Sequence, residues 1–130
     1  MTDTAADGIT KGTIVWGSDT IKIRLVASSA TPTRTMTTMT GMTAIGTDQT
    51  LGSKTQTSDT TNHREKFDAA DPTWTAVASG STIGYWIVFK FVANDAGSTP
   101  LWVETVTSTP TNGENVTVTF DAAGIFRTQQ

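Results

Sequence analysis

The sequence contains no cysteine in its 130 residues. This excludes disulfide bonds, thiolate zinc sites and cysteine nucleophiles together, and it is compatible with a reducing cytosol. The single histidine, His63, excludes a metal site built from several imidazoles of one chain. Charged residues make up only 16% of the chain, and the net charge of −3 includes no basic stripe. We therefore expect no nucleic-acid partner, no metal and no other cofactor.

Long hydrophobic runs are also absent. No apolar run approaches the ~20 residues that are needed to cross a bilayer. The segment Met1–Thr10 is polar and has neither the basic start nor the apolar run of a signal peptide. We expect a soluble protein without membrane contact. At this length the chain fits one domain and can bury roughly 65–70% of its unfolded surface.

Threonine is the most conspicuous residue that is present, at 29 of 130 positions. Its branched side chain suits a pleated, half-buried surface, and its hydroxyl keeps an exposed sheet face hydrated without long charged side chains. Low charge combined with threonine-rich strands is common among extracellular and virion β-proteins. The composition therefore favours an all-β protein of that kind.

Short apolar–polar alternations recur along the chain between turn signals. Counting them gives about eight short strands at a spacing of roughly 10 residues, hardly any helix and no βαβ pattern. We predict an all-β fold: an antiparallel β-sandwich or jelly-roll-like single domain at residues 12–130, with an extended N-terminal arm at residues 1–11. The expected strands are 13–16, 20–28, 63–68, 73–77, 83–92, 101–107 and 115–120, with a weak edge strand or loop at 51–61.

Two turns are expected to form hairpins. One joins the strands at 13–16 and 20–28, and the other is the Asn112-Gly113 signal. In the strand at 20–28, alternation predicts that Ile21, Ile23 and Leu25 point into the core and that Lys22 and Arg24 point outward.

The strand at 83–92 is apolar on both faces. Alternation places Tyr85, Ile87, Phe89 and Phe91 on one face and Trp86, Val88, Lys90 and Val92 on the other. A soluble protein rarely leaves such a surface uncovered. We expect the outer face to meet either the methionine-rich segment at 36–42 or another subunit.

Met36, Met39 and Met42 recur at every third residue. The interval suits one face of a short helix, but threonine and Gly41 weaken a helix there. One interpretation is a loop or helical turn that closes one end of the core. The other is an adaptable contact surface of the kind that methionine favours.

Catalytic patterns are missing. The sequence contains no Gly-x-Ser-x-Gly elbow and no phosphate-binding glycine loop. Asp68 and Asp71 could form a carboxylate pair, but aspartates beside Pro72 are typical of turns. His63 is expected to be an exposed strand residue. The chain is therefore not expected to be an enzyme.

All four tryptophans lie in expected strands. Trp16, Trp74, Trp86 and Trp102 are each suited to core packing. Tryptophans on a sheet face also stack on sugars and anchor protein interfaces. The sequence leaves these alternatives open.

Five segments together resemble a family of small structural proteins of tailed bacteriophages. They are Gly17-Ser-Asp-Thr-Ile-Lys-Ile-Arg-Leu-Val-Ala-Ser-Ser, Asp68-Ala-Ala-Asp-Pro-Thr-Trp, Tyr85-Trp-Ile-Val-Phe-Lys, Pro100-Leu-Trp and Asn112-Gly-Glu-Asn-Val-Thr-Val-Thr-Phe-Asp-Ala-Ala-Gly-Ile-Phe. The resemblance covers roughly residues 12–127 through the order and spacing of these segments. It departs between about residues 35 and 65, where Ile45-Gly-Thr-Asp-Gln-Thr-Leu-Gly replaces a glycine-rich segment of the family.

The resemblance implies a virion component without enzymatic activity, made in the host bacterial cytoplasm. Within it we expect a decoration (cement) protein on the outer capsid surface, a homotrimer that binds the major capsid protein. Alternatives are a tail or head-fibre module that binds carbohydrate through Trp16, Trp74 or Trp102, and a ring-forming tail or head–tail connector subunit. Removal of Met1–Lys11 is expected to weaken capsid attachment without affecting the fold. The candidate contact residues are Met1, Thr2, Ile9, Met36, Met39, Met42, Trp86 and Trp102.

Overall fold

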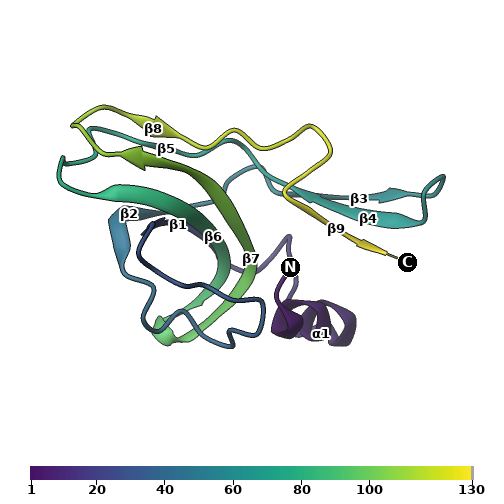
Figure 1. Ribbon diagram of the computed structural model, residues 1–130. Helices are drawn as coiled ribbons and strands as arrows, with labels where there is room; N and C mark the ends of the chain where they lie inside the picture. The colour runs from purple at the N-terminus through teal and green to yellow at the C-terminus, as the bar shows by residue number, and fades with distance from the viewer. Residues whose placement is uncertain (130) are drawn as a thin grey trace.

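The computed structural model describes residues 1–129 of the chain, and these form one helix and nine strands (Figure 1). The all-β, antiparallel prediction is confirmed. A jelly-roll arrangement is not seen, because the strands form sheets of four, three and two. The elements are α1 (Asp3–Lys11), β1 (Ile21–Ala27), β2 (Ala44–Thr50), β3 (Thr55–Asp59), β4 (Arg64–Asp68), β5 (Thr73–Trp74), β6 (Thr82–Val92), β7 (Asn94–Pro110), β8 (Val116–Thr117) and β9 (Phe126–Gln129).

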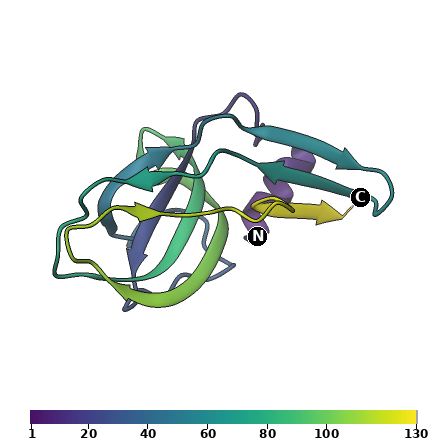
Figure 2. The same cartoon turned by 90° about the horizontal axis from the view of Figure 1, so that it is seen from above.

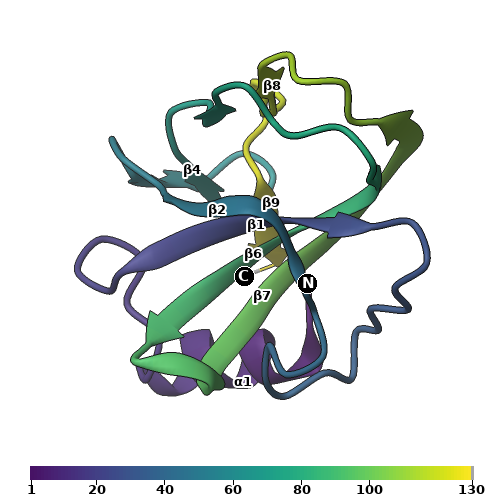
Figure 3. The same ribbon diagram turned by 90° about the vertical axis from the view of Figure 1, so that its left-hand side faces the viewer.

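The four-stranded sheet has the order β2-β1-β6-β7 and is strongly curved (Figures 1 and 3). Its central strands, β1 and β6, carry the β-branched and aromatic side chains that suit a pleated surface. The two-stranded sheet β5-β8 lies over one face of this curved sheet. The three-stranded sheet β3-β4-β9 extends away from it to one side.

The main core lies between the curved sheet and the two smaller sheets. Ile21, Ile23 and Leu25 of β1 are almost fully buried in it, as their alternation predicts. An aromatic cluster joins the three-stranded sheet to this core: Phe67 of β4 and Phe126 of β9 stack as a cross-strand pair with centroids 4.7 Å apart. Such pairs add about 0.5–1.5 kcal/mol beyond the area that they bury.

The outer face of the curved sheet carries a second, smaller core. It consists of Val26, Met39, Ile87 and Phe89, all nearly inaccessible to solvent. The loop at residues 28–43 covers it. The two-faced character of the strand at 83–92 is therefore confirmed, and the methionine-rich segment, as a loop rather than a helix, supplies the cover on the second face.

The predicted extended arm at residues 1–11 is wrong, because these residues form α1 and the segment that caps it. The Thr2 hydroxyl accepts a hydrogen bond from the backbone N–H of Ala5 at 3.2 Å, and Gly12 closes the other end in the left-handed conformation at φ 72°. Threonine, aspartate and Gly8 are weak helix formers, so composition disguises this helix. It packs against β7.

Both predicted hairpins are wrong. Residues 13–16 form turns instead of a strand, and the N–H of Val15 donates to the Asp19 carboxylate at 2.7 Å. The N–H of Gly113 donates to the carbonyl of Val77 at 2.8 Å, so the Asn112-Gly113 turn links the curved sheet to β8. Tertiary pairing overrides a local turn preference in both places.

Candidate functional site

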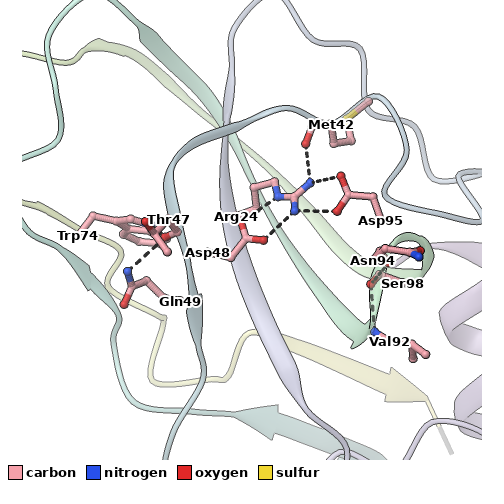
Figure 4. Close-up of polar contacts among 10 residues, drawn as sticks. All are labelled: Arg24, Met42, Thr47, Asp48, Gln49, Trp74, Val92, Asn94, Asp95 and Ser98. Atoms are coloured by element: carbon pink, nitrogen blue, oxygen red, sulfur yellow. Dashed lines mark hydrogen bonds and ion pairs between the residues drawn. The ribbon is translucent and has the colours of Figure 1, made fainter.

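The most elaborate polar cluster is centred on Arg24, on the outer face of the curved sheet (Figure 4). All five guanidinium N–H groups have partners. Nε and Nη2 donate to Asp48 of β2 at 2.8 and 2.7 Å, Nη1 and Nη2 each donate to Asp95 of β7 at 2.9 Å, and Nη1 also donates to the carbonyl of Met42 at 2.7 Å. This side chain of β1 therefore ties its strand to β2, to the start of β7 and to the covering loop.

Burial distinguishes this cluster from a surface ion pair. Arg24 points away from the main core, as predicted, but is only 7% exposed because the loop at residues 28–43 covers it. The hydrogen bonds with Asp48 raise the pKa of Arg24 above its ordinary value. Burial acts in the opposite direction, and the hydrogen bonds with Asp95 add to the increase. The hydrogen bonds from Arg24 hold the pKa of Asp95 below its usual range. Both carboxylates are thus occupied by the arginine, so we interpret the cluster as a structural clamp.

The turn between β6 and β7, at residues 92–98, holds Asp95 in position to accept the hydrogen bonds of Arg24. The Ser98 hydroxyl accepts from the N–H of Val92 at 3.1 Å and donates to the carbonyl of Asn94 at 2.7 Å (Figure 4). The N–H of Met39 reaches the same turn through the carbonyls of Asp95 and Ser98, both at 3.1 Å. The buried Met39 therefore pins the loop at residues 28–43 over the outer face.

The candidate contact residues divide by their exposure. Thr2 and Met39 are buried inside the chain at 1% and 0%, so they are packing residues and offer no surface to a partner. The N–H of Thr2 donates to the carbonyl of Leu101 at 2.9 Å. The Thr2 hydroxyl donates to the carbonyl of Pro100 at 2.5 Å. Trp86 is also buried, at 9%, whereas the remaining candidates are partly exposed: Met1, Ile9, Met36, Met42 and Trp102.

Trp86 and the partly exposed candidates do not form one patch. Met1 and Ile9 pack beside the main core, whereas Met36 and Met42 belong to the outer-face core. Burial, and secondarily the nearby Arg34, lower the pKa of the Met1 amine. Trp86 belongs to the main core, and Trp102 packs against it.

The tryptophan side chains pack against other residues of the chain, and Trp16 and Trp74 are buried. Trp16 is 2% exposed and meets both Phe67 and Phe126 edge to face, and Trp102 stacks on Phe126 with centroids 6.0 Å apart. The indole N–H of Trp74, also 2% exposed, donates to the carbonyl of Thr47 at 2.7 Å (Figure 4). Trp16 and Trp74 therefore present no ring face on which a sugar could stack.

A mostly apolar groove of about 440 Å³ lies between β7 and the segment that contains β8. Leu25, Ile83 and Trp86 form its floor, and Val106 and Val118 flank it. A neighbouring hollow of about 280 Å³ shares Trp86 and Val106 with it. Together the two hollows make one feature, the β7–β8 groove. Its walls come from segments that are far apart in the sequence, so no local pattern predicts it.

Two carboxylates lie at the second hollow. Glu104 accepts the indole N–H of Trp102 at 2.8 Å, and Asp121 accepts the backbone N–H of Ala123 at 2.7 Å. No lysine or arginine belongs to the described residues that line either hollow. The β7–β8 groove thus has an apolar floor and an acidic end.

Asp68 behaves as the turn residue that the sequence predicts, whereas Asp71 bonds a distant segment instead of its own turn. Asp68 accepts the N–H of Ala69 at 3.0 Å, and Asp71 accepts the N–H of Phe120 at 2.8 Å. His63 lies in the turn between β3 and β4 at φ 53°, exposed as predicted but not within a strand. Across residues 1–129, no group of three or more histidine, aspartate or glutamate side chains is arranged to hold a metal ion.

Comparison of the chain with protein-family models, with curated proteins and with solved structures finds no match. Within the part of the chain that the structure describes, the one helix falls short of the length and hydrophobicity that a transmembrane helix requires. The functional argument therefore depends on the residues and their geometry.

Proposed function

We propose that the chain is a bacteriophage capsid decoration protein that binds the outer surface of the head shell and stabilises it by bridging subunits of the major capsid protein. The observation that carries this proposal is the set of five segments that resemble phage structural proteins. They include β1, the end of β4 with β5, the central part of β6, the middle of β7 and the segment from β8 to the start of β9. These segments build the framework of the fold.

The physical character of the domain suits such a role. Its strongest polar cluster, around Arg24, is committed to holding a loop in place, and its tryptophans are committed to packing. The features that remain for contacts are the β7–β8 groove and the projecting β3-β4-β9 sheet. A rigid body with contact surfaces at its edges suits a clamp that is repeated over a shell, where many modest contacts act together.

The proposed assembly is a homotrimer on the virion surface. It is tested by measuring the mass of the purified protein by light scattering and then mixing it with expanded capsids that lack it. We expect a trimer that co-sediments with capsids and raises their disruption temperature. A ring of higher order would favour a connector or tail subunit, and a monomer that ignores capsids would refute the proposal.

A further inference from the structure

The β7–β8 groove lies between two strands whose outer edges are unpaired. β7 is the last strand of the four-stranded sheet, and β8 pairs with β5 on one side alone. Figures 2 and 3 show β8 lying between β5 and the end of β7. An unpaired edge presents backbone donors and acceptors that can pair with another extended chain.

The opposite edge of the curved sheet shows what a protected edge looks like in this protein. On β2, the carbonyl of Thr47 is occupied by the indole of Trp74 and by the amide of Gln49 at 3.2 Å (Figure 4). β2 also bends at Gly46, with φ 72°, and turns the charge of Asp48 inward to Arg24. Inward charges, irregular backbone and covering side chains are the usual means of guarding an edge.

The end of β7 has little of this protection. Its N-terminal part is covered where Thr2 bonds the carbonyl of Leu101, but Thr105, Thr107 and Thr109 are exposed and uncharged. The hydroxyl of Thr109 reaches the carbonyl of Thr107 at 2.8 Å, a local bond that an incoming N–H can replace. The unguarded edge coincides with the position of the groove.

We propose that the β7–β8 groove takes up an extended segment of a different chain as an added strand, with alternating apolar side chains on the floor and a basic side chain at Glu104 and Asp121. The backbone of the segment pairs with β7, β8 or both. Its apolar side chains pack against Trp86, Val106 and Val118, which line the groove.

The two carboxylates at the acidic end of the groove indicate that the incoming segment carries a basic side chain. In the described part of the chain neither Glu104 nor Asp121 takes part in an ion pair, and the hydrogen bonds of each leave acceptor capacity on the carboxylate. The Met1 amine lies within electrostatic range of Glu104. Lys66 lies close to Asp121, but its ammonium donates to the Ala122 carbonyl at 2.7 Å and pairs with Asp68, so the Asp121 carboxylate keeps acceptor capacity for an incoming cation.

A second copy of this chain does not fit as the source. The segments with alternating apolar residues, β1, β6 and β7, are already paired in the curved sheet. A strand still attached to its own sheet cannot enter between β7 and the wall at residues 115–119. The inference rests on the proposed function only for the name of the partner, which would be the major capsid protein.

The test uses the isolated, ¹⁵N-labelled protein and an acetylated, amidated peptide of sequence Thr-Val-Thr-Val-Lys-Val-Thr. Nuclear magnetic resonance titration is expected to shift the amides of residues 105–109 and 116–119 and to slow their hydrogen exchange. A peptide with Glu in place of Lys is expected to bind about three- to tenfold more weakly, the size of an interfacial charge effect. A peptide with two valines replaced by proline should not bind.

Two variants complete the test. Val106→Trp fills the groove and is expected to abolish binding; Asp121→Asn, at an exposed position, should remove most of the preference for Lys over Glu while leaving the fold unchanged. No shift at β7 and β8, equal binding of all three peptides, or shifts at Trp86 without slower amide exchange would each overturn the proposal. Because capsids play no part, the outcome is independent of the capsid-binding experiment.

Discussion

Arg24 and Asp48 lie on neighbouring strands and face each other through two hydrogen bonds, 2.8 Å from Nε to Oδ1 and 2.7 Å from Nη2 to Oδ2. The side chain of Asp48 is only 17% exposed. This paired geometry is specific to arginine, because a lysine ammonium cannot offer two parallel donors. The stability of the outer face should therefore depend on the arginine itself as well as on its charge.

Replacing Arg24 by methionine should lower the free energy of unfolding by about 2–4 kcal/mol, because it leaves a mostly buried carboxylate and the Met42 carbonyl without their partner. The free energy of unfolding of Arg24→Lys should lie between that of Arg24→Met and that of the native protein. Urea denaturation measures both. The matched control is Arg127→Met at an exposed position, which should change stability by no more than about 0.5 kcal/mol. Equal losses in Arg24→Met and the control would contradict the clamp.

Asp95 should make stability dependent on acid pH. Its pKa is lowered in the folded state from the ordinary value of 3.8, so its contribution is fully present above that value and is lost as the pH falls through the lower folded pKa. We expect the free energy of unfolding to decline below about pH 4. In Asp95→Asn this decline should be shallower. Denaturation curves at several pH values test this, and an identical acid decline in both proteins would refute it.

Thr2 should contribute to stability despite its position near the chain end. Thr2→Val removes the helix cap to Ala5 and leaves the carbonyl of Pro100 without its hydroxyl donor, which should cost about 1–2 kcal/mol. Thr10→Val is the control, because the Thr10 hydroxyl bonds Ala6 at an exposed site. Thermal unfolding measures the loss of stability in Thr2→Val and in Thr10→Val, and the loss should be larger in Thr2→Val. Contrary to the expectation from the sequence, removing residues 1–11 should also destabilise the fold, because it removes α1 from its contact with β7.

Gly84 should not tolerate a side chain. A Cβ at this position of β6 would lie 2.4 Å from the Cα of Ser28, a contact with backbone that no rotamer change relieves. Gly84→Ala should therefore destabilise the protein by about 2–4 kcal/mol or prevent folding. Gly17→Ala meets nothing within 4 Å and should be nearly neutral. Soluble expression and calorimetry measure the contrast, and equal behaviour of the two variants would contradict the close approach.

The positions of β1 and β6 followed from the sequence, whereas β2 was not predicted and only two residues of the predicted strand at 115–120 form β8. β1 and β6 occupy Ile21–Ala27 and Thr82–Val92, close to the predicted 20–28 and 83–92. The two apolar faces of β6 also predicted the need for cover on both sides. These features depend on neighbouring residues, which a sequence displays directly.

The clamp, the helix and the groove could not be predicted in the same way. Arg24 finds its carboxylates 24 and 71 residues away, so its burial depends on the finished topology. α1 has poor internal propensity, and its local signals are short: the caps at Thr2 and Gly12 and the i,i+4 ion pair between Asp7 and Lys11. The β7–β8 groove is made by segments that meet only through the packing of separate sheets.

The bond from Thr2 to the carbonyl of Leu101 has a consequence for how the molecule assembles. Thr2 leaves the ribosome long before Leu101, its docking position on β7, because the two residues are far apart in the sequence. Such distant pairings slow folding, because loop closure precedes the gain from contact. The first turn of α1 should therefore acquire protection from solvent exchange among the last parts of the molecule, after the curved sheet is in place.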